Sequence, residues 1–204
     1  MSAVSIRPGP KDLAAPPVQA CGPDGGDRAA RAWAALQAVP DPEIPVVSIQ
    51  DLGILREVTM AGDGTLEVVI TPTYSGCPAM AEIAEDIGRA LDAAGLAPWR
   101  IRTTLAPAWT TDWITAEGRA KLRQYGIAPP GRCGEGEGGA RTAGAKRMQF
   151  VPHAARAAAA LDLVACPRCG SLHTEQLARF ASTACKALYR CRDCREPFDY
   201  FKPY

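Results

Sequence analysis

The chain has 204 residues, of which 47% are hydrophobic and 22% are charged, a balance typical of a folded globular protein that can bury a core. Because 23 basic residues nearly balance 22 acidic ones, the net charge of +1 excludes bulk attraction to nucleic acid or anionic lipid. No run of about 18 apolar residues could span a bilayer, and the first residues lack the apolar segment of a secretory signal, so we expect a cytoplasmic protein with no membrane partner.

The N-terminal residues show where ordered structure should begin. Residues 1–26 are rich in proline, glycine and alanine and carry no periodic apolar pattern, so we predict a flexible tail. Residues 27–39 then place apolar side chains at helical spacing, and the proline-rich segment DPEIP ends that helix. A short turn or a helical piece is expected over residues 46–54.

Strand and helix patterns alternate over the next stretch of the chain. Alternation with period two indicates strands, whereas apolar residues three and four apart indicate a helix. In chain order we predict a hairpin over 55–71, a helix over 79–95, a strand over 99–107 and a helix over 115–126. The resulting order, αββαβα, predicts an α+β domain over residues 27–128, with a small open three-stranded sheet packed against helices.

A composition change then separates this domain from the C-terminal region. Residues 129–160 are rich in glycine and alanine and offer little to bury, so we predict a linker. A second domain is expected over residues 161–204. Cys21 in the tail and Cys133 in the linker are expected to have no specific role.

Four cysteines of the second domain form the strongest motif in the sequence. In a reducing compartment, clustered cysteines favour metal binding over disulfides. Two C-x-x-C pairs are separated by 21 residues, and they consist of Cys166, Cys169, Cys191 and Cys194. This pattern predicts a structural Zn²⁺ ribbon, because four thiolates fill a tetrahedral site and leave no open position for catalysis. A rubredoxin-like iron site and a redox dithiol pair are the alternatives.

Other residues of the second domain have less specific interpretations. Cys185 is interpreted as a buried thiol or local neighbour in preference to a ligand, and His173 as a surface histidine. Aromatic residues at 180, 189, 198, 200 and 201 are expected to cover the small core. Because arginines lie beside them, nucleic-acid contact is an alternative, although seven basic residues from 161 onward face five acidic ones.

Cys77 lies in TPTYSGCPAM, where a strand is expected to give way to a helix. If Pro78 is the first helical residue, Cys77 is the N-cap, where free amides and the helix dipole favour a thiolate. A Cys–His dyad within this domain is excluded, because the only histidines are His153 and His173 and no lysine occurs between residues 11 and 121. A dyad across domains would depend on a flexible linker, so the composition disfavours a cysteine hydrolase. No helix carries the E-x-x-H pattern of a di-iron enzyme either.

Oxygen ligands are available close to Cys77 in the predicted domain. Asp41 and Glu43 supply carboxylates, and Thr71 begins a run of hydroxyl-bearing residues. A thiolate with carboxylates nearby could hold iron or a cluster transiently. The alternative is that Cys77 only packs at the junction between strand and helix.

Several motifs together resemble a known family. DPEIPVVSIQDLGI, TPTYSGCPAM and LAPAWTTDWIT resemble the small SufT-like iron–sulfur assembly domain. With CPRCGS, STACKALYRC and EPFDYFK added, the combination resembles the PaaD (or PaaJ) family of accessory subunits of the bacterial phenylacetyl-CoA epoxidase system. The resemblance covers residues 29–128 and 162–202.

The resemblance implies a non-catalytic accessory protein of phenylacetate catabolism that helps assemble or insert metal centres. Its implied partners are the di-iron subunits of the epoxidase, their iron–sulfur flavin reductase, or both. Cys77 would contact transient iron or an iron–sulfur cluster, with Asp41, Glu43 and Thr71 as neighbours and Trp109 in the adjoining loop. The alternatives are a structural subunit of the oxygenase and a zinc-ribbon protein that binds nucleic acid.

Overall fold

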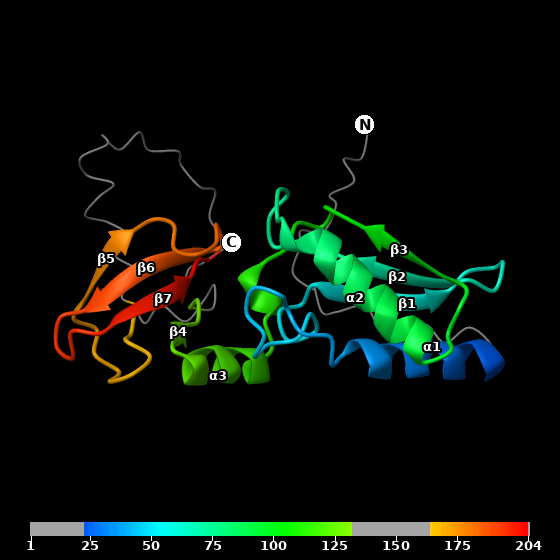
Figure 1. Ribbon diagram of the computed structural model, residues 1–204, viewed down its shortest axis with the longest axis horizontal. Coiled ribbons are helices and arrows are strands. Elements are labelled where there is room, and N and C mark those ends of the chain that lie inside the picture. Colours follow the sequence, from blue (N-terminus) through cyan, green and yellow to red (C-terminus); the bar gives the residue numbers. More distant parts are fainter. Residues whose placement is uncertain (1–22, 132–163, 204) are drawn as a thin grey trace, which may run out of the picture.

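The computed structural model describes residues 23–131 and 164–203 (Figure 1). Most of the predicted tail and nearly all of the predicted linker therefore lie outside the described residues, together with Cys21, Cys133 and His153. We refer to residues 23–126 as the N-terminal part and to residues 164–203 as the ribbon.

The N-terminal part has the predicted α+β architecture. Its elements are α1 (Pro23–Leu36), β1 (Leu55–Met60), β2 (Leu66–Ile70), α2 (Ala79–Ala93), β3 (Trp99–Thr103), the 3₁₀ helix η1 (Thr111–Trp113) and α3 (Ala116–Tyr125). The order αββαβα is confirmed, with η1 as an addition before the last helix. Among the described residues, no helix is long and apolar enough to cross a membrane.

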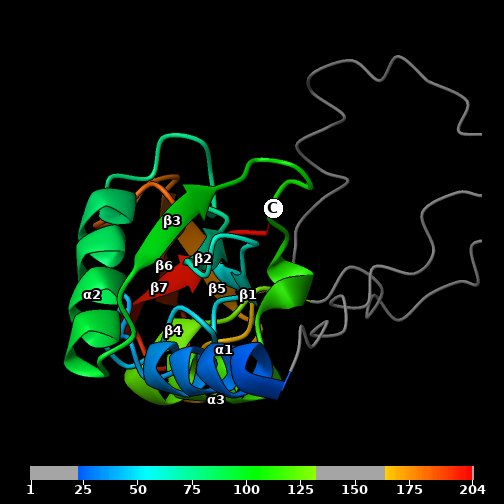
Figure 2. The same cartoon turned by 90° about the vertical axis from the view of Figure 1, so that its right-hand side faces the viewer.

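The three strands form the expected small open sheet, in the order β1-β2-β3. β1 and β2 form the predicted antiparallel hairpin, whereas β3 pairs with β2 in parallel after the crossover through α2. α2 packs against β3, and α1 packs against β1 and α2 (Figures 1 and 2). Helix and sheet side chains are fully buried between these layers, including Leu36, Leu66, Ile83, Ile87 and Leu91.

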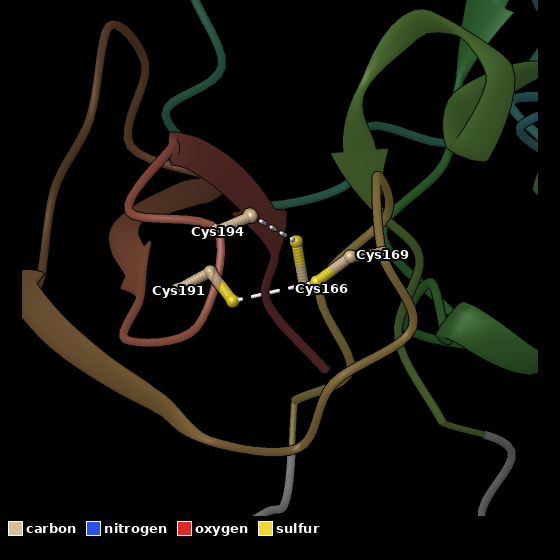
Figure 3. Close-up of side chains that lie close together, drawn as sticks. All are labelled: Cys166, Cys169, Cys191 and Cys194. Atoms are coloured by element: carbon tan, nitrogen blue, oxygen red, sulfur yellow. Dashed lines mark hydrogen bonds between the residues drawn. The ribbon is translucent and has the colours of Figure 1, made fainter.

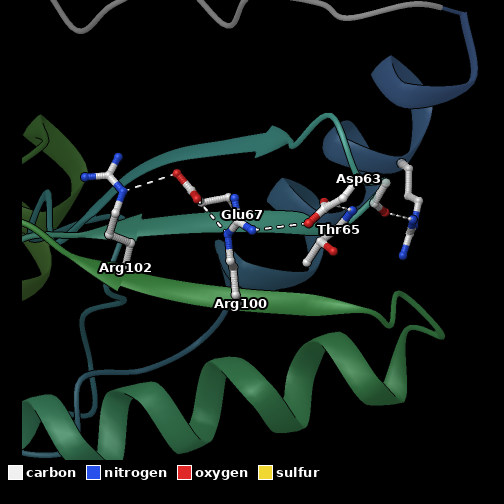
Figure 4. Close-up of polar contacts among 7 residues, drawn as sticks. Asp63, Thr65, Glu67, Arg100 and Arg102 are labelled. Atoms are coloured by element: carbon white, nitrogen blue, oxygen red, sulfur yellow. Dashed lines mark hydrogen bonds and ion pairs between the residues drawn. The ribbon is translucent and has the colours of Figure 1, made fainter.

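Ion pairs lie along the exposed side of β2 and β3 (Figure 4). Glu67 accepts from Arg100 at 2.8 Å and from Arg102 at 3.2 Å, because the parallel register places Glu67 beside Arg100. Oδ2 of Asp63 lies 3.4 Å from Nη1 of Arg100. Exposed pairs of this kind each contribute about 0–1 kcal/mol, so this side is a solvated surface and stability comes mainly from the buried face.

The ribbon consists of β5 (Thr174–Ala178), β6 (Lys186–Cys191) and β7 (Pro197–Phe201). A fourth strand, β4 (Ile127–Ala128), follows α3 directly and pairs in parallel with β7, which gives the sheet order β4-β7-β6-β5. The end of the N-terminal part is therefore a strand of the ribbon sheet. This pairing joins the two parts through backbone hydrogen bonds.

The aromatic residues of the ribbon serve two different cores. Phe198 and Tyr200 are buried in the small ribbon core, and Tyr189 packs against it, as predicted. Phe201 instead joins the large core of the N-terminal part, where its ring centroid lies 6.0 Å from that of Trp109. The prediction was wrong for Phe180, which is 62% exposed because it lies outside both cores.

A compact turn before β1 connects the sheet to α3. Asp51 and Ser48 cap each other's backbone amides at 3.0 and 3.1 Å, and Lys121 of α3 donates to Asp51 at 2.8 Å. Gly53 ends this turn with φ +68°, and a Cβ built there would lie 2.6 Å from the Cβ of Trp113. The turn therefore requires glycine both for its backbone conformation and for space.

Gly53→Ala should destabilise the protein more than Gly64→Ala. Both positions have positive φ, which costs a non-glycine residue about 1–2 kcal/mol, but nothing lies within 4 Å of a Cβ at Gly64. The contact with Trp113 should add about 1–3 kcal/mol for Gly53→Ala. Urea unfolding of the two variants measures the difference, and equal losses in the free energy of unfolding would contradict the close approach.

Candidate functional site

The four ribbon cysteines converge on one point (Figure 3). Their sulfur atoms all lie within 4.8 Å of one another, with Cys166 Sγ 3.7 Å from Cys194 Sγ and Cys169 Sγ 3.6 Å from Cys191 Sγ. One pair comes from the turn before β5, whereas the other comes from the last residue of β6 and the turn that follows it. Thiolates in this arrangement can supply all four ligands of a tetrahedral metal ion.

Both turns use the same backbone device to direct their sulfurs. The residue after the second cysteine has a left-handed conformation in each turn, with φ 75° at Gly170 and 65° at Arg195. Amides of the second turn also donate to Cys191, chiefly that of Cys194, and they lower the pKa of the Cys191 thiol to about 7. Within this turn, the backbone amides thus stabilise the thiolate of Cys191.

His173 takes no part in this cluster. Its imidazole is exposed, with Nδ1 3.4 Å from a carboxylate oxygen of Asp193. Among the described residues, the four cysteines are the only group of three or more potential ligands whose atoms lie within 4.8 Å of one another. The prediction of a surface histidine is confirmed.

Cys77 lies at the junction between the sheet and α2, but it is not the N-cap. Pro78 occupies that position in helical conformation, and the helix starts at Ala79. The prediction that Pro78 is the first helical residue was therefore wrong by one residue. The amide of Ala79 still donates to the sulfur, so the half-buried thiol remains in contact with the helix start.

The environment of Cys77 opposes ionisation. Burial raises the pKa of the Cys77 thiol, and the charges of Glu43 and Asp41 raise it further. The predicted activation by the helix start is therefore wrong, because desolvation and two negative neighbours outweigh one amide bond. These contacts thus favour the neutral thiol of Cys77 over the thiolate.

Asp41 brings a carboxylate into this region through a local turn. Its Oδ1 accepts from the amides of Glu43 at 3.0 Å and Ile44 at 2.8 Å, which fixes the DPEIP segment. Asp41 is only 6% exposed, and this burial raises the pKa of its carboxyl group. The structure thus places Asp41 and Glu43 in the electrostatic environment of Cys77, and their role as iron ligands stays a prediction.

The segment before Cys77 contributes two buried threonines. Thr73 makes a side-chain hydrogen bond to Cys77. Thr71 is 1% exposed, and its hydroxyl has no hydrogen-bond partner among the described residues. A buried hydroxyl without a partner lowers the free energy of unfolding by about 1–3 kcal/mol. The described contacts of Thr71 thus leave its hydroxyl unused both as a donor and as an acceptor.

Trp109 connects the candidate site to the ribbon. Its indole Nε1 donates to the carbonyl of Leu52 at 2.9 Å, and its ring contacts Phe201. The side chain is 5% exposed, so it is a packed residue of the junction between the two parts. It fixes the loop that follows β3 against both the Leu52 turn and the ribbon.

Two ribbon residues lie near this site although no sequence pattern placed them there. Lys186 is buried, pairs with Asp199 at 3.0 Å, and exerts its positive charge on Asp41 and Glu43. Cys185 is buried, as predicted, but in the large core of the N-terminal part. The sequence pattern predicted only a linker between the two domains, so it gave no reason to expect Cys185 and Lys186 near the acids at 41 and 43.

Asp41→Asn should lower the pKa of the Cys77 thiol, because it removes a negative neighbour while an amide oxygen can still accept both backbone bonds. The shift should be partial, since burial is the largest cause. We expect wild-type Cys77 to be alkylated by iodoacetamide with a midpoint above that of an ordinary thiol, and the variant with a lower midpoint. Mass spectrometry of the labelled peptide against pH measures both, and identical midpoints would contradict the electrostatic contact.

Comparison with known proteins adds two family matches. The profile of the PaaD zinc beta ribbon domain matches residues 151–202, and that of an iron–sulfur cluster assembly protein family matches residues 29–96. An Escherichia coli (strain K12) protein, whose name describes it as a candidate subunit of 1,2-phenylacetyl-CoA epoxidase, is 47% identical over 170 residues. These residues cover 83% of this chain and 90% of that protein.

Two shorter relatives match only part of this chain. A protein of Porphyromonas gingivalis (strain ATCC BAA-308 / W83) named "Fe-S protein maturation auxiliary factor" is 35% identical over 88 residues, or 43% of this chain and 83% of that protein. "Fe-S protein maturation auxiliary factor YitW" of Bacillus subtilis (strain 168) is 34% identical over 89 residues, which cover 43% of this chain and 86% of that protein. Since the Escherichia coli protein is matched over nearly its whole length, the chain belongs to the PaaD family of accessory proteins, which combine an iron–sulfur assembly type of domain with a ribbon.

Proposed function

We propose that this chain is a non-catalytic maturation factor that holds iron or an iron–sulfur cluster as cargo and delivers it to a phenylacetyl-CoA epoxidase complex. The clients would be the di-iron subunits, their iron–sulfur flavin reductase, or both. The observation that carries the proposal is the half-buried Cys77 thiol beside two carboxylates. The names of the relatives support the same class of function.

The proposed division of labour follows the two proposed domains, residues 27–128 and 161–204. Cys77 would contact the cargo, with Asp41 and Glu43 as neighbouring oxygen donors. Thr71 and Trp109 would shape the surrounding loops. Because an approaching cation favours the thiolate, metal capture would release the proton of Cys77 to solvent. The ribbon would stabilise the protein or dock a client, and a cytoplasmic location remains part of the proposal.

The nucleic-acid alternative has less support from the ribbon surface. Glu175 pairs with Arg190 and, at 2.8 Å, with Arg192. One carboxylate thus offsets part of the positive charge of the two arginines. Because binding to a phosphate backbone draws on positive charge, this pairing weakens the case for nucleic acid.

We propose zinc as the metal of the four ribbon cysteines. Four thiolates that can surround one ion tetrahedrally suit a structural zinc site with no open position. Cys191→Ser should abolish metal binding and lower the melting temperature of the whole chain. The reason is that β7 pairs with β4 and Phe201 packs in the large core, so loss of the ribbon also exposes the N-terminal part.

Elemental analysis and thermal unfolding test this role, with Cys133→Ser as the matched control. The wild type and the control should contain one zinc per chain. An unchanged melting temperature in Cys191→Ser would contradict the structural role. A red protein with iron in the ribbon would contradict zinc.

Cys77→Ser should reduce iron loading of the client enzyme while ribbon metal and folding stay intact. Serine keeps the size of the side chain but removes the thiolate that binds iron. The measurement is the iron content of the epoxidase and its reductase after co-expression with the wild type, Cys77→Ser or Cys133→Ser.

Client iron that is the same with all three proteins would overturn the maturation role. If the chain instead copurified with active epoxidase in fixed stoichiometry, and Cys77→Ser had no effect on loading, the structural role in the oxygenase would replace it.

A further inference from the structure

Cys185 is a ribbon residue whose side chain lies in the N-terminal part. It directly precedes β6, and it is 5% exposed. Its side chain belongs to the large core, against which Cys77 also packs, whereas the ribbon core contains Cys166 and Cys191. The sulfur of Cys185 therefore lies apart from the four-cysteine cluster and on the side of the candidate site.

The two sulfurs share one set of charged neighbours. Asp41 and Glu43 act electrostatically on Cys77 and also on Cys185. In Figure 1 the start of α2, which follows Cys77, points toward the end of the ribbon where β6 begins. Two thiols from different parts of the chain thus lie within electrostatic reach of the same pair of carboxylates.

The contacts of Cys185 leave its sulfur available for a ligand role. Its one described side-chain hydrogen bond is to the Thr183 hydroxyl at 3.0 Å, a local contact within the turn before β6. Lys186 brings a positive charge to the same region, which offsets part of the charge of the acids. The buried hydroxyl of Thr71 adds a polar group that lacks a partner among the described residues.

We propose that Cys185 supplies a second sulfur ligand to the Cys77 site, so that the cargo is bound between the two parts of the chain. The inference rests on the proposed function and deepens it. Two thiolates with two carboxylates match iron(II) or a small iron–sulfur cluster, since sulfur and oxygen donors together suit such cargo. Each thiol that binds loses its proton to the buffer, and no oxidant is needed.

The site differs from the ribbon cluster in how closely its ligands are gathered. Among the described residues, only the ribbon cysteines bring three or more ligand atoms within 4.8 Å of one another. Cys77 and Cys185 must therefore turn toward the cargo before both can bind it. Because that movement costs free energy, binding is weaker than in the ribbon, as release to a client requires.

The test uses Co²⁺ as the probe on full-length protein whose ribbon is loaded with zinc, under anaerobic conditions. Cobalt binds such sites more weakly than zinc and leaves the ribbon occupied. Thiolate-to-cobalt absorption in the near ultraviolet grows with the number of bound sulfurs. We expect a second-site signal that falls to about half in Cys77→Ser and in Cys185→Ser, with Co²⁺ affinity at least about tenfold lower in each. Cys133→Ser should match the wild type.

The outcomes separate this inference from the proposed function. If Cys185→Ser keeps the full signal and affinity while Cys77→Ser loses them, the role of Cys185 is overturned and the cargo role of Cys77 stands. If neither variant differs from the wild type, both proposals fail.

A second measurement covers the case in which Cys185→Ser does not fold because serine places a hydroxyl in the core. Cys185→Ala keeps the position apolar, and the Co²⁺ titration is repeated with this variant. Cobalt X-ray absorption of the zinc-loaded wild type needs no variant, because it counts the sulfurs around cobalt directly. Two sulfurs support the inference, whereas one or none overturns it.

Discussion

The packing of the ribbon onto the N-terminal part is the interaction on which the arrangement of the site depends. β4 leaves α3 and pairs with β7, and Phe201 at the end of β7 enters the large core beside Trp109. Burying a phenylalanine contributes about 1.5–3 kcal/mol, and the strand pairing fixes the direction of approach. The start of β6, with Cys185 and Lys186, is thereby carried to the acids near Cys77.

Two sulfur environments with different physical properties result from this packing. In the ribbon, left-handed turn residues hold four thiols together and backbone amides favour the thiolate of Cys191, which suits permanent metal binding. At Cys77, burial and negative neighbours keep the thiol protonated, so binding must be coupled to the arrival of positive charge. Under the proposed function, this difference would let one protein keep a structural ion in the ribbon while it exchanges a cargo at Cys77.

The sequence predicted those features that local patterns determine. Apolar periodicity and glycine placement predicted the αββαβα order, and C-x-x-C spacing predicted the cysteine cluster. It did not predict the pKa of Cys77, because burial depends on tertiary packing, nor the first residue of α2, where Pro78 is the N-cap. The proximity of Cys185 depends on the pairing of β4 with β7, two strands far apart in the chain, which no local pattern encodes.

Iron analysis of anaerobically purified protein is the most direct test of whether Cys77 holds a metal cargo. Wild-type chain isolated from iron-replete cells should contain iron, with or without sulfide, in addition to one zinc in the ribbon. Cys77→Ser should retain the zinc and lose the iron. Equal iron in both proteins, or none in the wild type after anaerobic loading with iron(II), would contradict the account.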